Sequence, residues 1–172
     1  MEEHVILVDE LDLPQGKMEK LEAHQKGALH RAFSVFVFND DQELLLQQRA
    51  KTKYHSGGLW TNTCCSHPRE GESNLAAAER RLMEEMGMSC ELLYGFNFLY
   101  KAEFEDGLIE HELDHVFFGK SNSKPQINRV EVENYKYVKL EDLKKDIEIN
   151  PDQYTTWLKI CLSKVFEHKM TL

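Results

Sequence analysis

The chain has 172 residues, a length that suits one compact domain with its own core. Its hydrophobic content of 41% and charged content of 30% are ordinary for a globular protein, which excludes the disordered and fibrous classes. The net charge of −9 argues against a nucleic-acid-binding protein, and no apolar run approaches the ~20 residues of a membrane-spanning helix. We therefore expect a single domain over residues 1–172 that binds neither nucleic acid nor membrane, with its oligomeric state left open.

The N-terminal segment MEEHVILVDELD is acidic and lacks the basic and then apolar layout of a signal peptide. This predicts a cytoplasmic protein, in which cysteines stay reduced. Cys64 and Cys65 are adjacent, while Cys90 and Cys161 lie far away, so the four cysteines form no CxxC pair. A zinc-finger site is therefore not supported.

The first third of the chain predicts three strands and one helix. Residues 4–10 are typical of a short strand, and residues 17–27 predict a helix that ends at its glycine. Residues 31–38 and 43–49 predict two strands, and the turn-forming residues between them indicate a hairpin. A glycine-rich segment, SGGLW, then leads into TNTCCSHP.

The clearest predicted helix follows, over residues 73–87. Ser73 is a suitable N-cap, and Gly87 is a suitable stop. Four apolar side chains recur at helical spacing and predict the buried face: Leu75, Ala78, Leu82 and Met86.

Residues 90–104 and 108–120 predict two long strands separated by the turn EDG, and a further strand is expected near residues 133–140. The chain then predicts a helix over residues 152–166. Its expected apolar face consists of Tyr154, Trp157, Leu158, Cys161 and Val165. Strands and helices in this order predict an α+β domain, in which helices flank a mixed sheet in α/β/α layers.

Side chains alternate across a strand, so Glu110, Glu112 and Asp114 share one face of the strand 108–120. Three histidines, His24, His30 and His67, have polar or small neighbours; each taken alone is most simply a surface histidine. Taken with the carboxylates, they offer a mixed nitrogen and oxygen set that suits a five- or six-coordinate Mn²⁺, Mg²⁺ or Zn²⁺.

Basic side chains gather in the first third of the chain despite its acidic average. Such a cluster is either a solvated face or a local site for a phosphate. Its members are Lys17, Lys20, Lys26, Arg31, Arg49, Lys51 and Lys53.

The segment EGESNLAAAERRLMEEMG has the spacing of the Nudix box, whose helix carboxylates hold Mg²⁺ against a diphosphate. Two positions depart from the box: Ser66 replaces its leading glycine, and Arg81 replaces the first helix glutamate. Arginine forms bidentate pairs with phosphate oxygens, so Arg81 is expected to bind a phosphate at the position where the box has a metal ligand. The alternative is a charged, solvated helix face.

Four segments, EAHQKGALHRAFSVFVF, LLLQQRAKTKYHSGGLWTNTCCSHP, ERRLMEEMG and LIEHELDHVF, occur in an order and spacing that resemble the type 1 isopentenyl diphosphate isomerases. The resemblance runs from about Lys20 to Trp157. It implies a Nudix-like fold and an enzyme of isoprenoid biosynthesis that interconverts isopentenyl and dimethylallyl diphosphates. The TNTCCSHP segment and the later ExE pair carry its specificity.

The resemblance also implies the role of each site residue. It implies catalytic residues at Cys65 and Glu112, with Tyr100 and Trp157 as pocket aromatics. In an extended segment the side chain of Cys64 would point away from that of Cys65, which predicts that Cys64 is a packing residue. The ligands of one divalent ion are expected at His24, His30, His67, Glu110 and Glu112, and Glu85 is expected to hold a Mg²⁺ on the diphosphate. The positions around the phosphates are Lys20, Arg49, Lys53, Ser66 and Arg81.

Two rival interpretations remain at this point. A Nudix-type diphosphate hydrolase is favoured by the helix pattern, but Arg81 and the cysteine at the site weaken it, because hydrolysis needs neither. A metal-binding regulatory module that only retains the fold is the second rival. The metal in the histidine site and the order in which Cys65 and Glu112 donate protons stay open.

Overall fold

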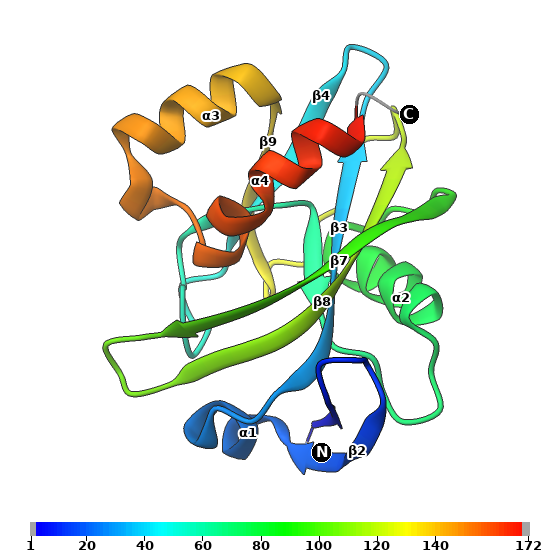
Figure 1. Cartoon of the computed structure of the whole chain (residues 1–172). Helices are drawn as coiled ribbons and strands as arrows, with labels where there is room; N and C mark the ends of the chain where they lie inside the picture. Colours follow the sequence, from blue (N-terminus) through cyan, green and yellow to red (C-terminus); the bar gives the residue numbers. More distant parts are fainter. Residues whose placement is uncertain (1–2, 170–172) are drawn as a thin grey trace.

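A mixed sheet runs through the centre of the molecule and has helices on both faces, as the computed structural model in Figure 1 shows. The structure describes residues 3–169 of the chain. The predicted α+β layers are confirmed. The strands are β1 (His4–Val8), β2 (Pro14–Glu19), β3 (His30–Phe38), β4 (Glu43–Arg49), β5 (Trp60–Thr61), β6 (Cys64–Ser66), β7 (Leu92–Glu103), β8 (Ile109–Lys120) and β9 (Val132–Lys139). The helices are α1 (Lys20–Lys26), α2 (Asn74–Met86), α3 (Leu140–Ile149), the short 3₁₀ turn η1 (Pro151–Gln153) and α4 (Thr156–Lys169).

Strand β3 is the spine of the sheet. It pairs in parallel with β8 along its whole length, from His30 opposite Glu112 to Phe38 opposite Lys120. It also pairs with the short strand β6, where Ser34 lies opposite Cys65. These two pairings bring segments that are far apart in the sequence to the same end of the sheet.

The alternation of side chains along β3 divides the core into two parts. Phe33, Val35 and Val37 are buried against α2, whereas Phe36 and Phe38 are buried on the other face, in the core that α3 and α4 cover. Each fully buried side chain of this size contributes about 1.5–3 kcal/mol through the hydrophobic effect. The two cores hold the sheet rigidly between its helical layers.

The boundaries of the first helix differ from the prediction. Helix α1 begins at Lys20 rather than residue 17, because residues 14–19 form β2 and pair with β1. The Glu19 carboxylate caps α1 by accepting hydrogen bonds from the backbone N–H groups of Leu21 and Glu22. The expected stop at Gly27 is confirmed, with a φ of 66°.

The predicted hairpin between residues 31–38 and 43–49 is only marginal. The ladder between β3 and β4 contains one pair, Phe38 opposite Leu44, because β3 pairs mainly with β8 and β4 pairs mainly with β9. The two strands therefore diverge from their shared turn, and the open end between them is where the site lies.

Helix α2 has the predicted Ser73 cap and Gly87 stop, but its buried face is rotated. Leu75 was expected in the core and is 40% exposed, whereas Ala77 is fully buried. The side chain of Glu85 is also buried on this helix. The buried face of α2 therefore includes a charged side chain. This side chain, Glu85, lies on the side of the helix that faces the site.

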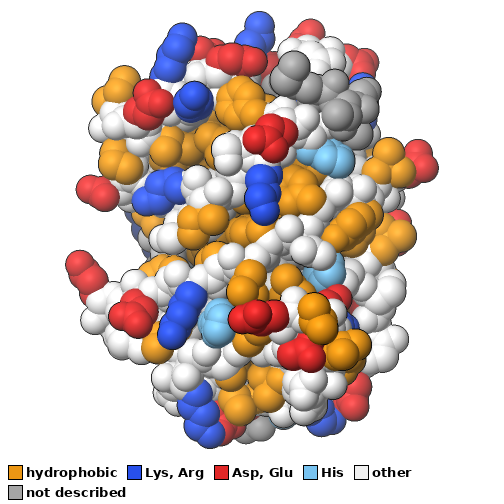
Figure 2. Space-filling model, viewed as in Figure 1, with side chains coloured by type: hydrophobic (Ala, Val, Ile, Leu, Met, Phe, Trp, Pro, Cys, Tyr) orange, Lys and Arg blue, Asp and Glu red, His pale blue; other side chains and the backbone are white. Residues whose placement is uncertain are grey.

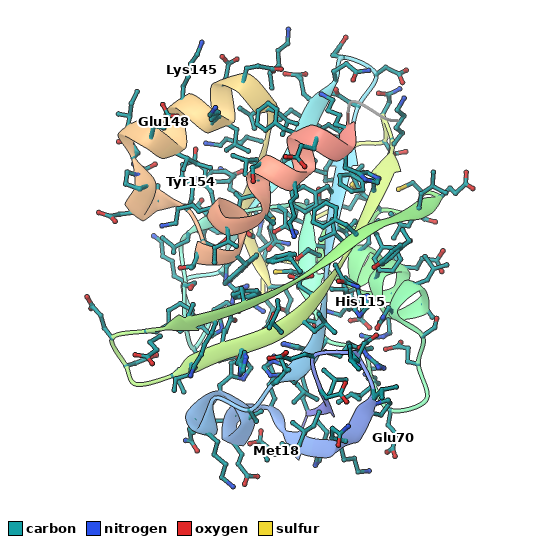
Figure 3. All side chains as sticks on the ribbon, in the orientation of Figure 1. Met18, Glu70, His115, Lys145, Glu148 and Tyr154 are labelled. Atoms are coloured by element: carbon teal, nitrogen blue, oxygen red, sulfur yellow. The ribbon has the colours of Figure 1, made fainter. Side chains whose placement is uncertain are left out.

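The C-terminal region contains an unpredicted helix, α3, and α4 begins later than expected. Tyr154 lies before α4 rather than on it, where it forms a parallel bridge with Trp60. Its ring is buried as predicted, and its hydroxyl donates a hydrogen bond to Asp146 of α3 (Figure 3). Tyr154 thus fixes α3 against the start of α4.

The surface carries charges of both signs. On the face shown in Figure 2, acidic and basic side chains lie among one another, with apolar side chains between them. Among the described residues, no helix is long and apolar enough to cross a membrane.

Candidate active site

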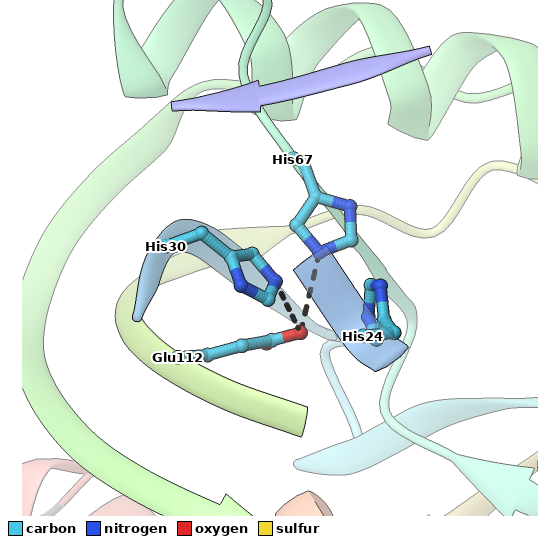
Figure 4. Close-up of side chains that lie close together, drawn as sticks. All are labelled: His24, His30, His67 and Glu112. Atoms are coloured by element: carbon cyan, nitrogen blue, oxygen red, sulfur yellow. Dashed lines mark hydrogen bonds and ion pairs between the residues drawn. The ribbon is translucent and has the colours of Figure 1, made fainter. Parts of the chain in front are cut away.

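Three histidines and one glutamate meet at the end of the sheet where β3 begins (Figure 4). We call His24, His30, His67 and Glu112 the histidine cluster. One ligand atom from each lies within 4.8 Å of all the others. Glu112 Oε1 lies 3.4 Å from His30 Nε2 and 3.2 Å from His67 Nε2. The structure therefore brings four of the five predicted ligands of one ion together.

Backbone carbonyls fix the tautomers of two of these histidines. His24 Nδ1 lies 2.6 Å from the carbonyl oxygen of Lys20, and His30 Nδ1 lies 2.9 Å from that of Ala28. A carbonyl only accepts, so each Nδ1 carries a proton, and in the neutral ring each Nε2 keeps a lone pair. Both Nε2 atoms are buried and have no hydrogen-bond partner.

These orphaned nitrogens test whether the residues fit a divalent ion. A buried polar atom without a partner is costly, and a cation among the four ligand atoms would satisfy both nitrogens at once. Burial lowers the pKa of His67 to about 3, so its ring is neutral and able to bind a metal. Burial alone raises the pKa of Glu112, but the contacts with His30 and His67 outweigh it and hold this pKa well below its ordinary value. The donor set fits a divalent ion.

Glu110, the fifth predicted ligand, lies beside the cluster and has different partners. Its Oε1 is 4.0 Å from His24 Nε2 but only 2.9 Å from His55 Nε2. The hydroxyl of Tyr100 lies 2.7 Å from Glu110 Oε2 and 2.9 Å from Glu112 Oε2, so it bridges the two carboxylates. Tyr100 therefore lies at the site.

The two adjacent cysteines lie on opposite faces of β6. Cys64 is fully buried in the α2 core, as expected for a packing residue, whereas Cys65 lines the cavity beside Glu112 and Trp157. Burial raises the pKa of Cys65 well above its ordinary value, and the charge of Arg49 offsets only part of this. Cys65 is therefore a neutral thiol in the resting protein.

Trp157 enters the same cavity from α4. Its Nε1–H donates to Asn62 Oδ1 at 3.2 Å, which fixes the ring, and the Arg49 guanidinium lies 5.2 Å from the ring centroid. The ring face is thus a surface on which positive charge is stabilised.

The opposite end of the cavity carries pairs of fixed charges, and we call Arg81, Glu85, Lys53 and Glu131 the α2 charge group. Arg81 forms ion pairs with Glu85 and, at 3.4 Å, with Glu131, and Glu131 also pairs with Lys53. Gln47 Nε2 donates to Glu85 Oε2 at 2.8 Å and orients that carboxylate. Both anions and both cations of this group are therefore mutually neutralised.

Only part of the basic cluster noted in the sequence converges here. Lys20, Arg49 and Lys53 line the cavity, together with Ser66 and Arg81. The others pair with surface carboxylates: Lys17 with Glu70, on the loop before α2 (Figure 3), Lys26 with Glu22, and Arg31 with Asp12. Lys51 is exposed outside the cavity.

Five residues that line the cavity were not predicted to do so: Gln47, His55, Asp114, Phe33 and Tyr54. Glu131, which pairs with Lys53 of the cavity, was not predicted either. A glutamine in a leucine-rich strand and a histidine in a glycine-rich loop were the available signals for the first two. Burial raises the pKa of Asp114, with the charge of Glu112 adding to the effect, and Ser34 donates to its Oδ2 at 2.8 Å. No local pattern marks Glu131.

Comparisons with known proteins agree with this arrangement. Residues 28–158 match the NUDIX domain family. Among solved structures, DR0079 from Deinococcus radiodurans has a TM-score of 0.79 at 16% identity, with 94% of this chain and 98% of that chain covered. A MutT protein from Methanosarcina mazei has a TM-score of 0.65 at 17% identity, with 82% and 95% covered. The fold is therefore that of the NUDIX class.

Two curated relatives are much more similar. Isopentenyl-diphosphate Delta-isomerase 2 from Aromatoleum aromaticum is 54% identical over 165 residues, which cover 96% of this chain and 87% of that protein. Isopentenyl-diphosphate Delta-isomerase from Pectobacterium atrosepticum is 53% identical over 161 residues, which cover 94% and 90%. The chain belongs to the NUDIX family and, within it, to the isopentenyl-diphosphate Delta-isomerases.

Proposed function

We propose that this protein interconverts isopentenyl and dimethylallyl diphosphates by protonation and deprotonation of the alkene. The observation that carries the proposal is the placement of Cys65 and Glu112 in one cavity, from different strands, with Trp157 beside them. Moving the double bond requires a proton added at C4, a tertiary carbocation at C3 and a proton removed at C2. Two separate acid/base groups supply this chemistry.

The carbocation needs more stabilisation than one ring gives. A cation–π contact contributes ~0.5–2 kcal/mol, whereas enzymes lower barriers by roughly 8–23 kcal/mol. A carboxylate about 4 Å away contributes about 4 kcal/mol at an effective dielectric near 20. The group that has donated its proton is an anion beside the carbocation, so we infer that the Cys65 thiolate or the Glu112 carboxylate stabilises the carbocation more than Trp157 does.

The diphosphate end of the substrate is assigned to the basic side of the cavity. Arg49, Lys53, Lys20 and Arg81 would bind the phosphates, with Ser66 as a hydroxyl donor. Holding this end fixes the small apolar tail between Cys65 and the carboxylates, which converts binding energy into orientation.

Two divalent ions complete the proposal. The histidine cluster with Glu110 would hold one ion, which we assign to Mn²⁺, Mg²⁺ or Zn²⁺, and Glu85 would hold a Mg²⁺ on the diphosphate. The charge of an ion bound to Glu112 would make that carboxyl a stronger acid. We also propose a cytoplasmic enzyme whose partner is this small substrate, rather than nucleic acid or membrane.

The test is to incubate the purified protein with isopentenyl diphosphate and Mg²⁺ and to measure dimethylallyl diphosphate. Cys65→Ala should abolish turnover, whereas the matched variant Cys64→Ala should stay within a few-fold of wild type, because only Cys65 faces the cavity. Equal losses in both variants would refute the role of Cys65. Efficient release of phosphate from nucleoside diphosphate derivatives by the wild type would instead favour the hydrolase alternative.

A further inference from the structure

His55 is a buried histidine to which the proposed reaction gives no role. It lies on the loop between β4 and β5 and is 7% exposed. Its ring stacks on Phe104 with centroids 4.9 Å apart and meets the edge of Trp157 at 6.0 Å. Its backbone carbonyl accepts a hydrogen bond from Arg49 at 3.3 Å. The ring is therefore held firmly in the cavity wall.

The loop that carries His55 has an energetically unfavourable backbone conformation. Ser56, which follows His55, has a φ of 53°, and Gly58 has a φ of 80°. The left-handed region is unfavourable for a serine, so the surrounding contacts must stabilise it there. The conformation points His55 Nε2 at Glu110 Oε1, 2.9 Å away.

His55 differs from the histidines of the cluster in its tautomer. His24 and His30 each place a carbonyl oxygen at Nδ1, which leaves Nε2 with a lone pair. His55 Nδ1 instead lies 3.2 Å from Ser56 Oγ, a hydroxyl that can donate, and its Nε2 faces a carboxylate that only accepts. The partners of His55 therefore require a proton on Nε2, and this nitrogen is a donor.

We propose that His55 is a positioning residue of the divalent-ion site, which donates Nε2–H to Glu110 Oε1 and does not bind the ion itself. Tyr100 binds the other oxygen of Glu110, so the two contacts together fix the plane of the carboxylate. The lone pairs of Glu110 that accept no hydrogen bond then face His24 Nε2, which lies 4.0 Å from Glu110 Oε1. The inference rests on the ion site of the proposed function.

Hydrogen bonds to a metal ligand affect metal binding measurably, since the loss of one lowers metal affinity about 10–100-fold. Glutamine places an amide N–H where histidine has Nε2–H, and leucine places no donor there. His55→Leu should therefore weaken Mn²⁺ binding about 10–100-fold, whereas His55→Gln should stay within about threefold of wild type.

The experiment measures Mn²⁺ affinity without substrate, from the electron paramagnetic resonance signal of the free ion. Thr52→Ala, an exposed change on the same loop, is the control for loop perturbation, and circular dichroism checks the fold of each variant. Equal weakening in both His55 variants would make His55 a direct ligand and overturn the proposal. Unchanged affinity in His55→Leu would overturn it as well.

The readout does not require turnover, so the inference and the proposed function fail separately. A wild type that binds Mn²⁺ but forms no dimethylallyl diphosphate would refute the isomerase function. The ratio of Mn²⁺ affinities between His55→Gln and His55→Leu would still decide the role of His55.

Discussion

The histidine cluster and the α2 charge group both contain buried carboxylates, but they compensate their charges differently. In the histidine cluster, His24 Nε2 and His30 Nε2 are buried without partners. In the α2 charge group, Glu85 is paired with Arg81, and Glu131 with Lys53. The first region is preorganised to receive a cation, whereas the second already contains its own cations.

This difference suggests an order of binding. An ion that enters the histidine cluster replaces only the contacts of Glu112 with His30 and His67 and displaces no lysine or arginine side chain. A Mg²⁺ at Glu85 would compete with Arg81, and a diphosphate whose oxygens bound Arg81 would remove that competition. We therefore expect one ion to bind without substrate and the other only with a diphosphate.

The largest expected effect comes from emptying the histidine cluster. His30→Ala removes one ligand and breaks one of the buried contacts of Glu112, a loss of about 3–5 kcal/mol, or roughly 10²–10⁴-fold in a rate or binding constant. Isomerisation and substrate-free Mn²⁺ binding should both fall by such factors. The control is His111→Asn, which keeps a donor to the Gly27 carbonyl on the other face of β8. Retained Mn²⁺ affinity in His30→Ala would show that the cluster is not the ion site.

Reversing a charge in the α2 charge group should have the next largest effect. Arg81→Glu removes a charge-assisted contact worth about 1.5–3 kcal/mol and places an anion beside the phosphates, so KM should rise at least about 10–100-fold. Substrate-free Mn²⁺ binding at the histidine cluster should not change.

The same substitution restores the Nudix-box carboxylate, but no strong hydrolase should result, because a positioned water and a matching pocket are also required. Isomerase and diphosphatase kinetics should be measured side by side for wild type and variant. Unchanged isomerase kinetics would show that Arg81 does not contact the diphosphate.

Ion counting tests the proposed order of binding directly. Equilibrium binding of Mn²⁺ should give one tight site in the free protein and a second one, at least about tenfold tighter than before, when a methylene diphosphonate is added. Chelation should accordingly stop turnover in two stages. Two tight sites in the free protein would contradict the distinction between the regions.

The smallest effect is expected on the outer side of α2, where Arg80 forms a bidentate pair with Glu72 at 2.7 and 2.9 Å. Glu72→Gln should lower the free energy of unfolding by about 1–2 kcal/mol at pH 7 and leave isomerase kinetics unchanged. The hydrogen bond with Arg80 lowers the pKa of Glu72.

A carboxyl with a lowered folded pKa stabilises the protein above its unfolded pKa, near 4.3 for glutamate, and loses this contribution as the pH falls through the folded pKa. The stability difference between wild type and Glu72→Gln should therefore be constant from pH 7 to about 5 and shrink below about pH 4. Urea unfolding at each pH measures it. A difference that does not change with pH would exclude the ionic origin.

Features set by local periodicity could be predicted from the sequence. Strand alternation placed Glu110, Glu112 and Asp114 on one face, and all three are buried together. The same alternation separated Cys64 from Cys65. These predictions needed only the period of a strand, which does not depend on the rest of the fold.

Features set by contacts between distant segments could not be predicted from the sequence. Glu131 pairs with Lys53 across 78 positions, and the histidine of the loop before β5 reaches Glu110 only because that loop turns inward. The rotated face of α2, with Leu75 exposed, depends on which strands lie beneath the helix. Such details follow from tertiary packing, which overrides helical spacing.

The shortness of β6 has an evolutionary consequence. Cys64 is buried in the core and Cys65 lines the cavity, so removing or adding one residue upstream would exchange the environments of the two cysteines. During evolution this segment should therefore change by substitution and not by insertion or deletion. This can be tested with a library of single-codon insertions and deletions over residues 59–68 that is selected for isomerase activity. No surviving variant should carry an insertion or deletion in β6 or in the residues immediately before it.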